Sequence, residues 1–125
     1  MIEDNKKFQQ KYFHDLVPDY KYMLFRETLS SEEQHEGLQA LMSKDVEEYI
    51  DSRIDKIVIA LGDLHYAGIN IQKAWDTVLK SNMSKKRGTK PGREGSDGKD
   101  VYKDEDFIQV SHEDNHGVLN EIFSN

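Results

Sequence analysis

The chain has 125 residues, of which 33% are charged and 36% hydrophobic, and its net charge is −7. This length predicts one domain with a modest core, and the high charge favours amphipathic helices. Cysteine is absent, which excludes disulfides and thiolate metal sites. No apolar run approaches the ~20 residues of a membrane span, and the negative charge argues against nucleic-acid binding. We therefore expect a soluble, cytoplasmic protein without a membrane or nucleic-acid partner.

Two helices are predicted at the start of the chain. The first runs from Asn5 to about Leu16 and ends before Pro18, which cannot continue a helix. Asp19 can cap the second helix, which extends from Tyr20 to Met42. Gly37 lies within this second helix and weakens it relative to alanine.

The third predicted helix, from about Val46 to Ala67, has the clearest pattern. Asp45 and Glu48 form a capping box at its start, and the short link to the preceding helix implies an antiparallel pair. Its apolar side chains are spaced as a packing seam: Ile50, Ile54, Ile57, Leu61 and Leu64. A fourth helix is expected from Asn70 to about Ser81, with Trp75 on its inner side. Residues 1–83 are thus expected to form an all-α, four-helix-bundle-like core.

The composition changes after Met83. Residues 84–93 are basic and contain glycine, so they are predicted to form a loop. Residues 101–110 contain enough apolar and aromatic side chains for a short strand, and the last residues for one or two helical turns. We expect residues 84–125 to be an extension of the same domain.

Acidic residues recur at i,i+3 spacing on the second and third helices. Glu33 and Glu36 form one pair, Glu48 and Asp51 the other, and Asp55 follows one turn later. Residues three apart share a helix face, so antiparallel helices can point both pairs at one place. Carboxylate oxygens so placed suit Mg²⁺. The same spacing is also common on solvated helix faces, so this observation leaves both readings open.

A second observation concerns the face of the third helix that carries Glu48 and Asp51. On the third helix it continues from Asp55 through Ile59 and Gly62 to Tyr66, and so turns from acidic to largely apolar. A purely solvated face rarely changes in this way. The stripe therefore favours a site over a surface charge pattern.

In combination, these motifs resemble a known family. They are Glu32-Glu33 with Glu36, Glu48-x-x-Asp51-x-x-x-Asp55, Tyr66-Ala67-Gly68-Ile69-Asn70, and Ser81-Asn82-Met83-Ser84-Lys85 followed by Gly98-Lys99-Asp100-Val101. The pattern, over roughly residues 8–110, is similar to the MazG-like, all-α nucleoside triphosphate pyrophosphohydrolases. This family includes phosphoribosyl-ATP pyrophosphohydrolase-like proteins and is often encoded by phages and bacteria.

The resemblance implies a homodimer or homotetramer that hydrolyses a nucleoside triphosphate, with a deoxynucleotide favoured, to the monophosphate and pyrophosphate. The implied cofactor is Mg²⁺, with Mn²⁺ as a substitute. The residues that match the family's metal site are Glu33, Glu36, Glu48 and Asp51, with Asp55 as a supporting ligand. Glu32 and Glu33 are the implied catalytic residues, which orient or deprotonate the attacking water. The implied nucleotide-binding residues are Asn82, Lys85, Lys86 and Arg93.

Two other readings remain open. In the first, the chain is a non-catalytic acidic helical dimer that binds a protein partner, and its carboxylates are solvated. In the second, it is the histidine-pathway phosphoribosyl-ATP pyrophosphohydrolase itself. Phe13 and His14 in the first helix are candidates to reach a nucleobase in an oligomer, and the sequence leaves base recognition open.

Overall fold

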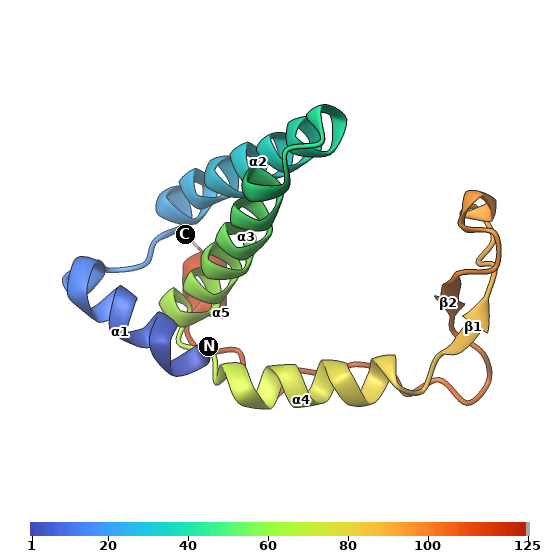
Figure 1. Ribbon diagram of the computed structural model, residues 1–125. Helices are drawn as coiled ribbons and strands as arrows, with labels where there is room; N and C mark the ends of the chain where they lie inside the picture. Colours follow the sequence, from blue (N-terminus) through green and yellow to red (C-terminus); the bar gives the residue numbers. More distant parts are fainter. Residues whose placement is uncertain (125) are drawn as a thin grey trace. The chain divides into compact units, whose positions relative to one another are not determined.

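The computed structural model describes residues 1–124 and is mainly helical, as the sequence predicts (Figure 1). The elements in chain order are α1 (Ile2–Phe13), α2 (Tyr20–Ser43), α3 (Val46–Tyr66), α4 (Ile71–Asn82), β1 (Lys86–Gly88), a 3₁₀ turn (Glu94–Ser96), β2 (Asp100–Tyr102) and α5 (Leu119–Phe123). The chain divides into two compact units. The first comprises Met1–Ile71 with the residues from His116 onward, and the second is Gln72–Asn115. None of the described helices combines the length and apolar character needed to cross a membrane.

Local capping sets the limits of α2 and α3. The backbone N–H of Tyr22 donates to the Asp19 carboxylate at 2.7 Å, and that of Glu48 donates to Asp45 at 3.1 Å. Between the helices, Lys44 adopts a left-handed conformation at φ 57° and closes α2 through bonds to its last carbonyls. Both predicted caps are confirmed, and the two helices form an antiparallel hairpin (Figure 1).

Small residues let α2 and α3 approach closely. Gly37, Ala40, Ser52 and Gly62 are all buried in this unit. A Cβ on Gly37 would lie 2.6 Å from Nη1 at the end of the Arg53 side chain, which would have to move, and 3.0 Å from Ser52 Oγ, which is a tight contact. Gly37 therefore does more than weaken its helix, because it makes room for α3.

A buried arginine joins the two helices at the other end of the hairpin. The Arg26 side chain pairs with Asp63 and donates from Nη2 to the Ile59 carbonyl at 3.0 Å. Its guanidinium also lies 4.9 Å from the centre of the Tyr66 ring. Burial, followed by the neighbouring Tyr22, raises the pKa of Tyr66, so this phenol stays neutral. The cluster fixes the register of α2 against α3.

The first three residues of the predicted packing seam of α3 face solvent within this chain, whereas Leu61 and Leu64 are half-buried. Ile50, Ile54 and Ile57 are 52%, 54% and 40% exposed, whereas Ser52, Gly62 and Tyr66 are buried. The seam prediction was therefore wrong for Ile50, Ile54 and Ile57. Two stripes of the same helical period run along α3, and α2 covers the one with the smaller side chains, where helix axes can come closer.

α1 and the C-terminal segment complete the first unit. The Asn5 side-chain amide donates to the Val58 carbonyl at 3.3 Å, which places α1 against α3. Phe13 meets the Tyr66 ring edge-on, with 6.3 Å between ring centres. At the other end of the chain, the Val118 N–H donates to the Ala67 carbonyl at 2.7 Å, and α5 buries Ile122. The expected C-terminal helical turns are confirmed.

The second unit contains most of α4 and a β-hairpin. The segment predicted as a loop forms β1, which pairs antiparallel with β2 so that Lys86 faces Tyr102 and Gly88 faces Asp100. That prediction was wrong for residues 86–88, and the strand expected within 101–110 is limited to its first residues. Gly88 suits this position because a Cβ there would lie 2.8 Å from the Tyr102 ring.

Trp75 differs from the sequence prediction as well. It was expected on the packed side of its helix, but it is 57% exposed. Because α4 from Gln72 onward belongs to the second unit, a four-helix bundle that includes it stays a prediction.

Candidate functional site

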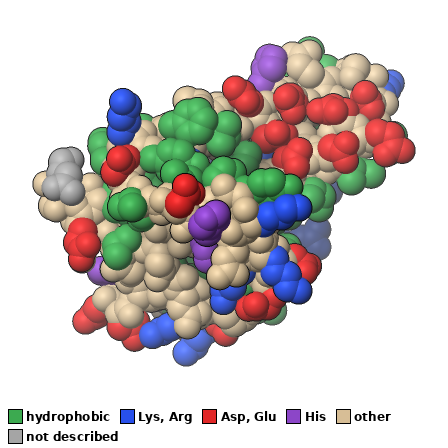
Figure 2. Space-filling model, turned by 90° about the vertical axis from the view of Figure 1, so that its left-hand side faces the viewer, with side chains coloured by type: hydrophobic (Ala, Val, Ile, Leu, Met, Phe, Trp, Pro, Cys, Tyr) green, Lys and Arg blue, Asp and Glu red, His purple; other side chains and the backbone are tan. Residues whose placement is uncertain are grey.

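The predicted metal ligands occupy the end of the α2–α3 hairpin that is nearest its turn. Glu33 and Glu36 come from α2, and Glu48, Asp51 and Asp55 come from α3. A group of acidic side chains covers this part of the molecule in the space-filling view (Figure 2). Glu33 and Glu48 are half-buried, and the other three are exposed. Helical spacing and the antiparallel hairpin together produce this arrangement.

Electrostatic interactions show that the two helices bring these carboxylates together. The pKa of Glu33 is raised, first by burial and then by the charges of Glu36, Asp55 and Glu48. The last two of these residues belong to α3, so the repulsion acts across the hairpin. The Oε2 atom of Glu33 is shielded from solvent and has no hydrogen-bond partner among the described residues.

The raised pKa of Glu48 on α3 shows the same clustering of carboxylates from the opposite helix. Its pKa is raised by burial, and then by Glu36, Asp51, Asp45 and Asp55. Each of the five predicted ligands therefore interacts with at least one other member of the group. Asp45 is an addition that sequence reasoning assigned only to capping. Its proximity follows from the cap itself, because the Asp45 carboxylate accepts from the Glu48 N–H.

The carboxylates repel one another but do not form a closed cage. Among residues 1–124, no three histidine, aspartate or glutamate side chains converge closely enough to hold one ion. The donor set consists of oxygen atoms only, which matches the preference of Mg²⁺ and Ca²⁺ rather than that of softer metals. The group is thus a concentration of negative charge in which Glu33 has an unsatisfied oxygen.

Glu32, the other predicted catalytic residue, is exposed on α2. It lies four residues before Glu36 and therefore one helical turn away on a neighbouring part of the surface. Glu32 and Glu36 are both exposed, whereas Glu33 is half-buried and Gly37 is buried against α3. Glu32 consequently borders the acidic group on its solvent side.

The four predicted nucleotide-binding residues belong to the second unit. Asn82 is exposed at the end of α4, Lys85 is half-buried and Lys86 is exposed on β1. Arg93 is engaged by Asp100, with Nε to Oδ2 at 2.7 Å and Nη2 to Oδ1 at 3.1 Å. This bidentate pair would have to open before Arg93 could bind a phosphate. The approach of these residues to the carboxylates stays a prediction.

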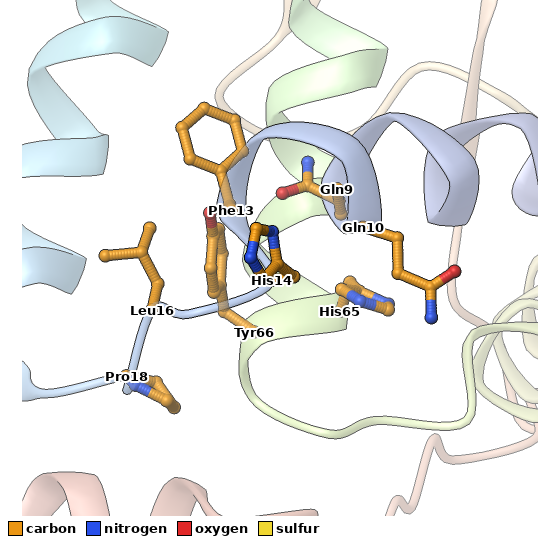
Figure 3. A pocket seen from close by; sticks show the side chains of 8 residues that line it. All are labelled: Gln9, Gln10, Phe13, His14, Leu16, Pro18, His65 and Tyr66. Carbon is orange, nitrogen blue, oxygen red and sulfur yellow. The ribbon is translucent and has the colours of Figure 1, made fainter.

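The sequence did not predict a pocket that lies in the first unit beside α1 and the C-terminal end of α3. It has a volume of about 300 Å³ and is lined by residues of α1, the segment after it and the end of α3: Gln9, Gln10, Phe13, His14, Leu16, Pro18, His65 and Tyr66 (Figure 3). Gln9 is only 3% exposed, and its Oε1 has no partner among the described residues. The sequence held no signal for this burial, because a single polar residue in a helix is normally solvated.

Comparison of the chain with protein-family models, curated proteins and solved structures found no match. The assignment of function therefore depends on the residues and on the geometry described above.

Proposed function

We propose that the chain is a Mg²⁺-dependent nucleoside triphosphate pyrophosphohydrolase of the MazG-like type. The observation that supports this proposal best is the group of five carboxylates gathered from two helices, in which Glu33 and Glu48 have raised pKa values. Such mutual repulsion has no structural benefit in the free protein, and a bound cation would relieve it. Perturbed carboxylates of this kind are found preferentially at functional sites.

Glu33, Glu36, Glu48 and Asp51 would hold the metal, with Asp55 as a further ligand. Because no three of the described side chains converge on one point, the carboxylates would have to draw together around the ion. The shielded Oε2 of Glu33 is an acceptor with no hydrogen-bond partner among the described residues, and the set contains only the hard oxygen ligands that Mg²⁺ takes. When bound, Mg²⁺ supplies positive charge that offsets the charge of the triphosphate. Phosphates would otherwise be repelled by the carboxylates, so activity requires the ion.

The carboxylates beside the metal ligands supply the proton acceptor. In the proposed reaction, water attacks the α-phosphorus, the bond from that phosphorus to the bridging oxygen breaks, and pyrophosphate leaves. The proton of the water passes to Glu32 or Glu33. A raised pKa makes Glu33 a stronger base than an ordinary carboxylate. Asn82, Lys85, Lys86 and Arg93 are proposed to bind the nucleotide.

A nucleotide panel with product identification tests this proposal. The full-length protein is incubated with Mg²⁺ and each common ribo- and deoxynucleoside triphosphate, and with phosphoribosyl-ATP, and the products are separated by ion-exchange chromatography. We expect monophosphate and pyrophosphate from at least one substrate, and their loss in Glu36→Gln and Glu48→Gln. Glu27→Gln, which changes an exposed glutamate of α2 outside the group, is the matched control. Release of orthophosphate alone, or equal activity in all variants, would refute the proposal.

The second candidate function is a non-catalytic helical module, and the exposed apolar side chains of the two hairpin helices favour it. Ile50, Ile54 and Ile57 of α3 are accompanied by Leu38 and Leu41 of α2, which are 50% and 54% exposed. Side chains of this kind mark an association surface. A homo-oligomer formed through this face is compatible with both candidate functions. Only the enzyme requires the carboxylates to bind Mg²⁺, so metal-linked stabilisation distinguishes the two.

A further inference from the structure

The loop between β1 and β2 contains an aspartate in a left-handed conformation that is followed by a glycine. Asp97 ends the 3₁₀ turn at φ 54°, and Gly98 continues the chain at φ 74°. Side chains disfavour this region of φ, although aspartate enters it more often than most residues. The exposed Asp97 is held by a bond from its N–H to the Glu94 carbonyl at 3.2 Å, and the Lys99 N–H donates to the Ser96 carbonyl at 3.1 Å. Exposed loop bonds of this kind open readily, so the backbone at Asp97 can rotate.

Gly98 presents an accessible backbone nitrogen to the Asp97 side chain. Its N–H donates no hydrogen bond to any described residue, and a Cβ built on it would meet nothing closer than Thr89 Oγ1 at 3.9 Å. Glycine has no side chain that could hinder attack by its nitrogen. No other aspartate or asparagine in the sequence is followed by glycine. The side-chain carboxyl and the nitrogen that can attack it are therefore combined at one position.

We propose that Asp97 is a site of spontaneous isomerisation to isoaspartate. The Gly98 nitrogen bonds to the Asp97 Cγ, and a carboxyl oxygen leaves as water with its own proton and the amide proton. The succinimide that results then takes up one water. If the bond between the main-chain carbonyl carbon of Asp97 and the Gly98 nitrogen breaks, the chain continues through the former side chain, and if the new bond to Cγ breaks, aspartate is restored. One water leaves and one is added, so no other reactant is required.

Isomerisation would change a loop that is closed by an ion pair. Arg93 and Asp100 lie on either side of Asp97 in the sequence, and their side chains form the bidentate pair. Isoaspartate inserts one methylene group into the backbone between them and leaves a free carboxylate on the Asp97 Cα. The bond from the Lys99 N–H to the Ser96 carbonyl spans the inserted group. We therefore expect that bond to be lost in the modified chain.

Incorporation of heavy oxygen measures the reaction, because the water that opens the succinimide leaves its oxygen in the product. The full-length protein is stored at neutral pH and physiological temperature in water enriched in the heavy isotope and is digested in ordinary water. Mass spectrometry with electron-transfer fragmentation then locates the label and identifies isoaspartate. Asp106 is the internal control, because it is exposed outside the helices and strands but precedes Phe107, whose N–H donates to the Asp104 carbonyl at 3.2 Å. We expect at least tenfold more label at Asp97 than at Asp106.

Gly98→Asn tests the role of the accessible nitrogen. Asparagine tolerates the left-handed region, so the loop should keep its conformation, but its side chain hinders attack by its own nitrogen. We expect at least tenfold less label at Asp97 in this variant, with an unchanged circular dichroism spectrum. Equal labelling of Asp97 and Asp106, or labelling of Asp97 that Gly98→Asn leaves unchanged, would overturn the inference. The reaction involves neither metal nor nucleotide, so either result is independent of the proposed function.

Discussion

Replacement of Arg26 by methionine should destabilise the hairpin that carries the carboxylates. The Arg26 side chain is 6% exposed and makes an ion pair with Asp63, a bond to the Ile59 carbonyl and a contact with the Tyr66 ring. Loss of one partner from a buried ion pair costs about 3–5 kcal/mol. The Asp63 side chain is 26% exposed and therefore partly hydrated. The lower end of that range applies, so the expected loss of stability is about 3 kcal/mol.

For a protein of this size, that loss corresponds to a melting temperature lower by roughly 10 °C. Far-UV circular dichroism during thermal and urea unfolding measures both quantities. Arg53→Met is the matched control, because Arg53 contacts the Tyr49 ring but has a buried Nη1 without a hydrogen-bond partner among the described residues. Its replacement should change stability by less than about 1 kcal/mol. Equal losses in the two variants would refute the reasoning that Arg26 joins the helices through its ion pair.

Three further predictions follow from the carboxylate group and the exposed face. The pKa values of Glu33 and Glu48 are raised above 4.5 in the folded chain, so at pH values above 4.5 the folded chain binds more protons than the unfolded chain. The free energy of unfolding should therefore fall as the pH rises above 4.5. Urea titrations across this range should show a smaller fall in Glu33→Gln, and an unchanged fall would contradict the assignment. Mg²⁺ should raise the melting temperature at neutral pH more than sodium chloride of equal ionic strength does, and Glu48→Gln should reduce that rise. Ile54→Glu should convert an oligomer to a monomer in light-scattering measurements, whereas Val17→Glu, at a position that is 81% exposed, should leave the mass unchanged.

The sequence was sufficient for the caps of α2 and α3 and for the acidic group, whereas α1 begins and ends three residues before the predicted helix. Asp19 and Asp45 cap through hydrogen bonds to residues three positions away, so their signal is local. The carboxylates meet across the hairpin because two helical repeats and a short link determine the geometry. These features require no knowledge of distant contacts.

Other features depend on contacts that are distant in sequence. Two stripes of α3 have the same period, and only the docking of α2 decides that Ser52 is buried while Ile54 is exposed. From the sequence, Gly37 is only a residue that weakens its helix, because the neighbouring Arg53 side chain is known only from the structure. The burial of Gln9 could not be predicted either, because a single polar residue in a helix is normally solvated.

The position of the attacked phosphorus tests the central claim most directly. The nucleotide that the protein prefers is hydrolysed with Mg²⁺ in water enriched in the heavy oxygen isotope, and both products are analysed by mass spectrometry. Attack at the α-phosphorus beside the carboxylates predicts one heavy oxygen in the nucleoside monophosphate and none in the pyrophosphate, with turnover lost in Glu36→Gln. A label in the pyrophosphate, or labelled monophosphate formed equally well by Glu36→Gln, would contradict the account.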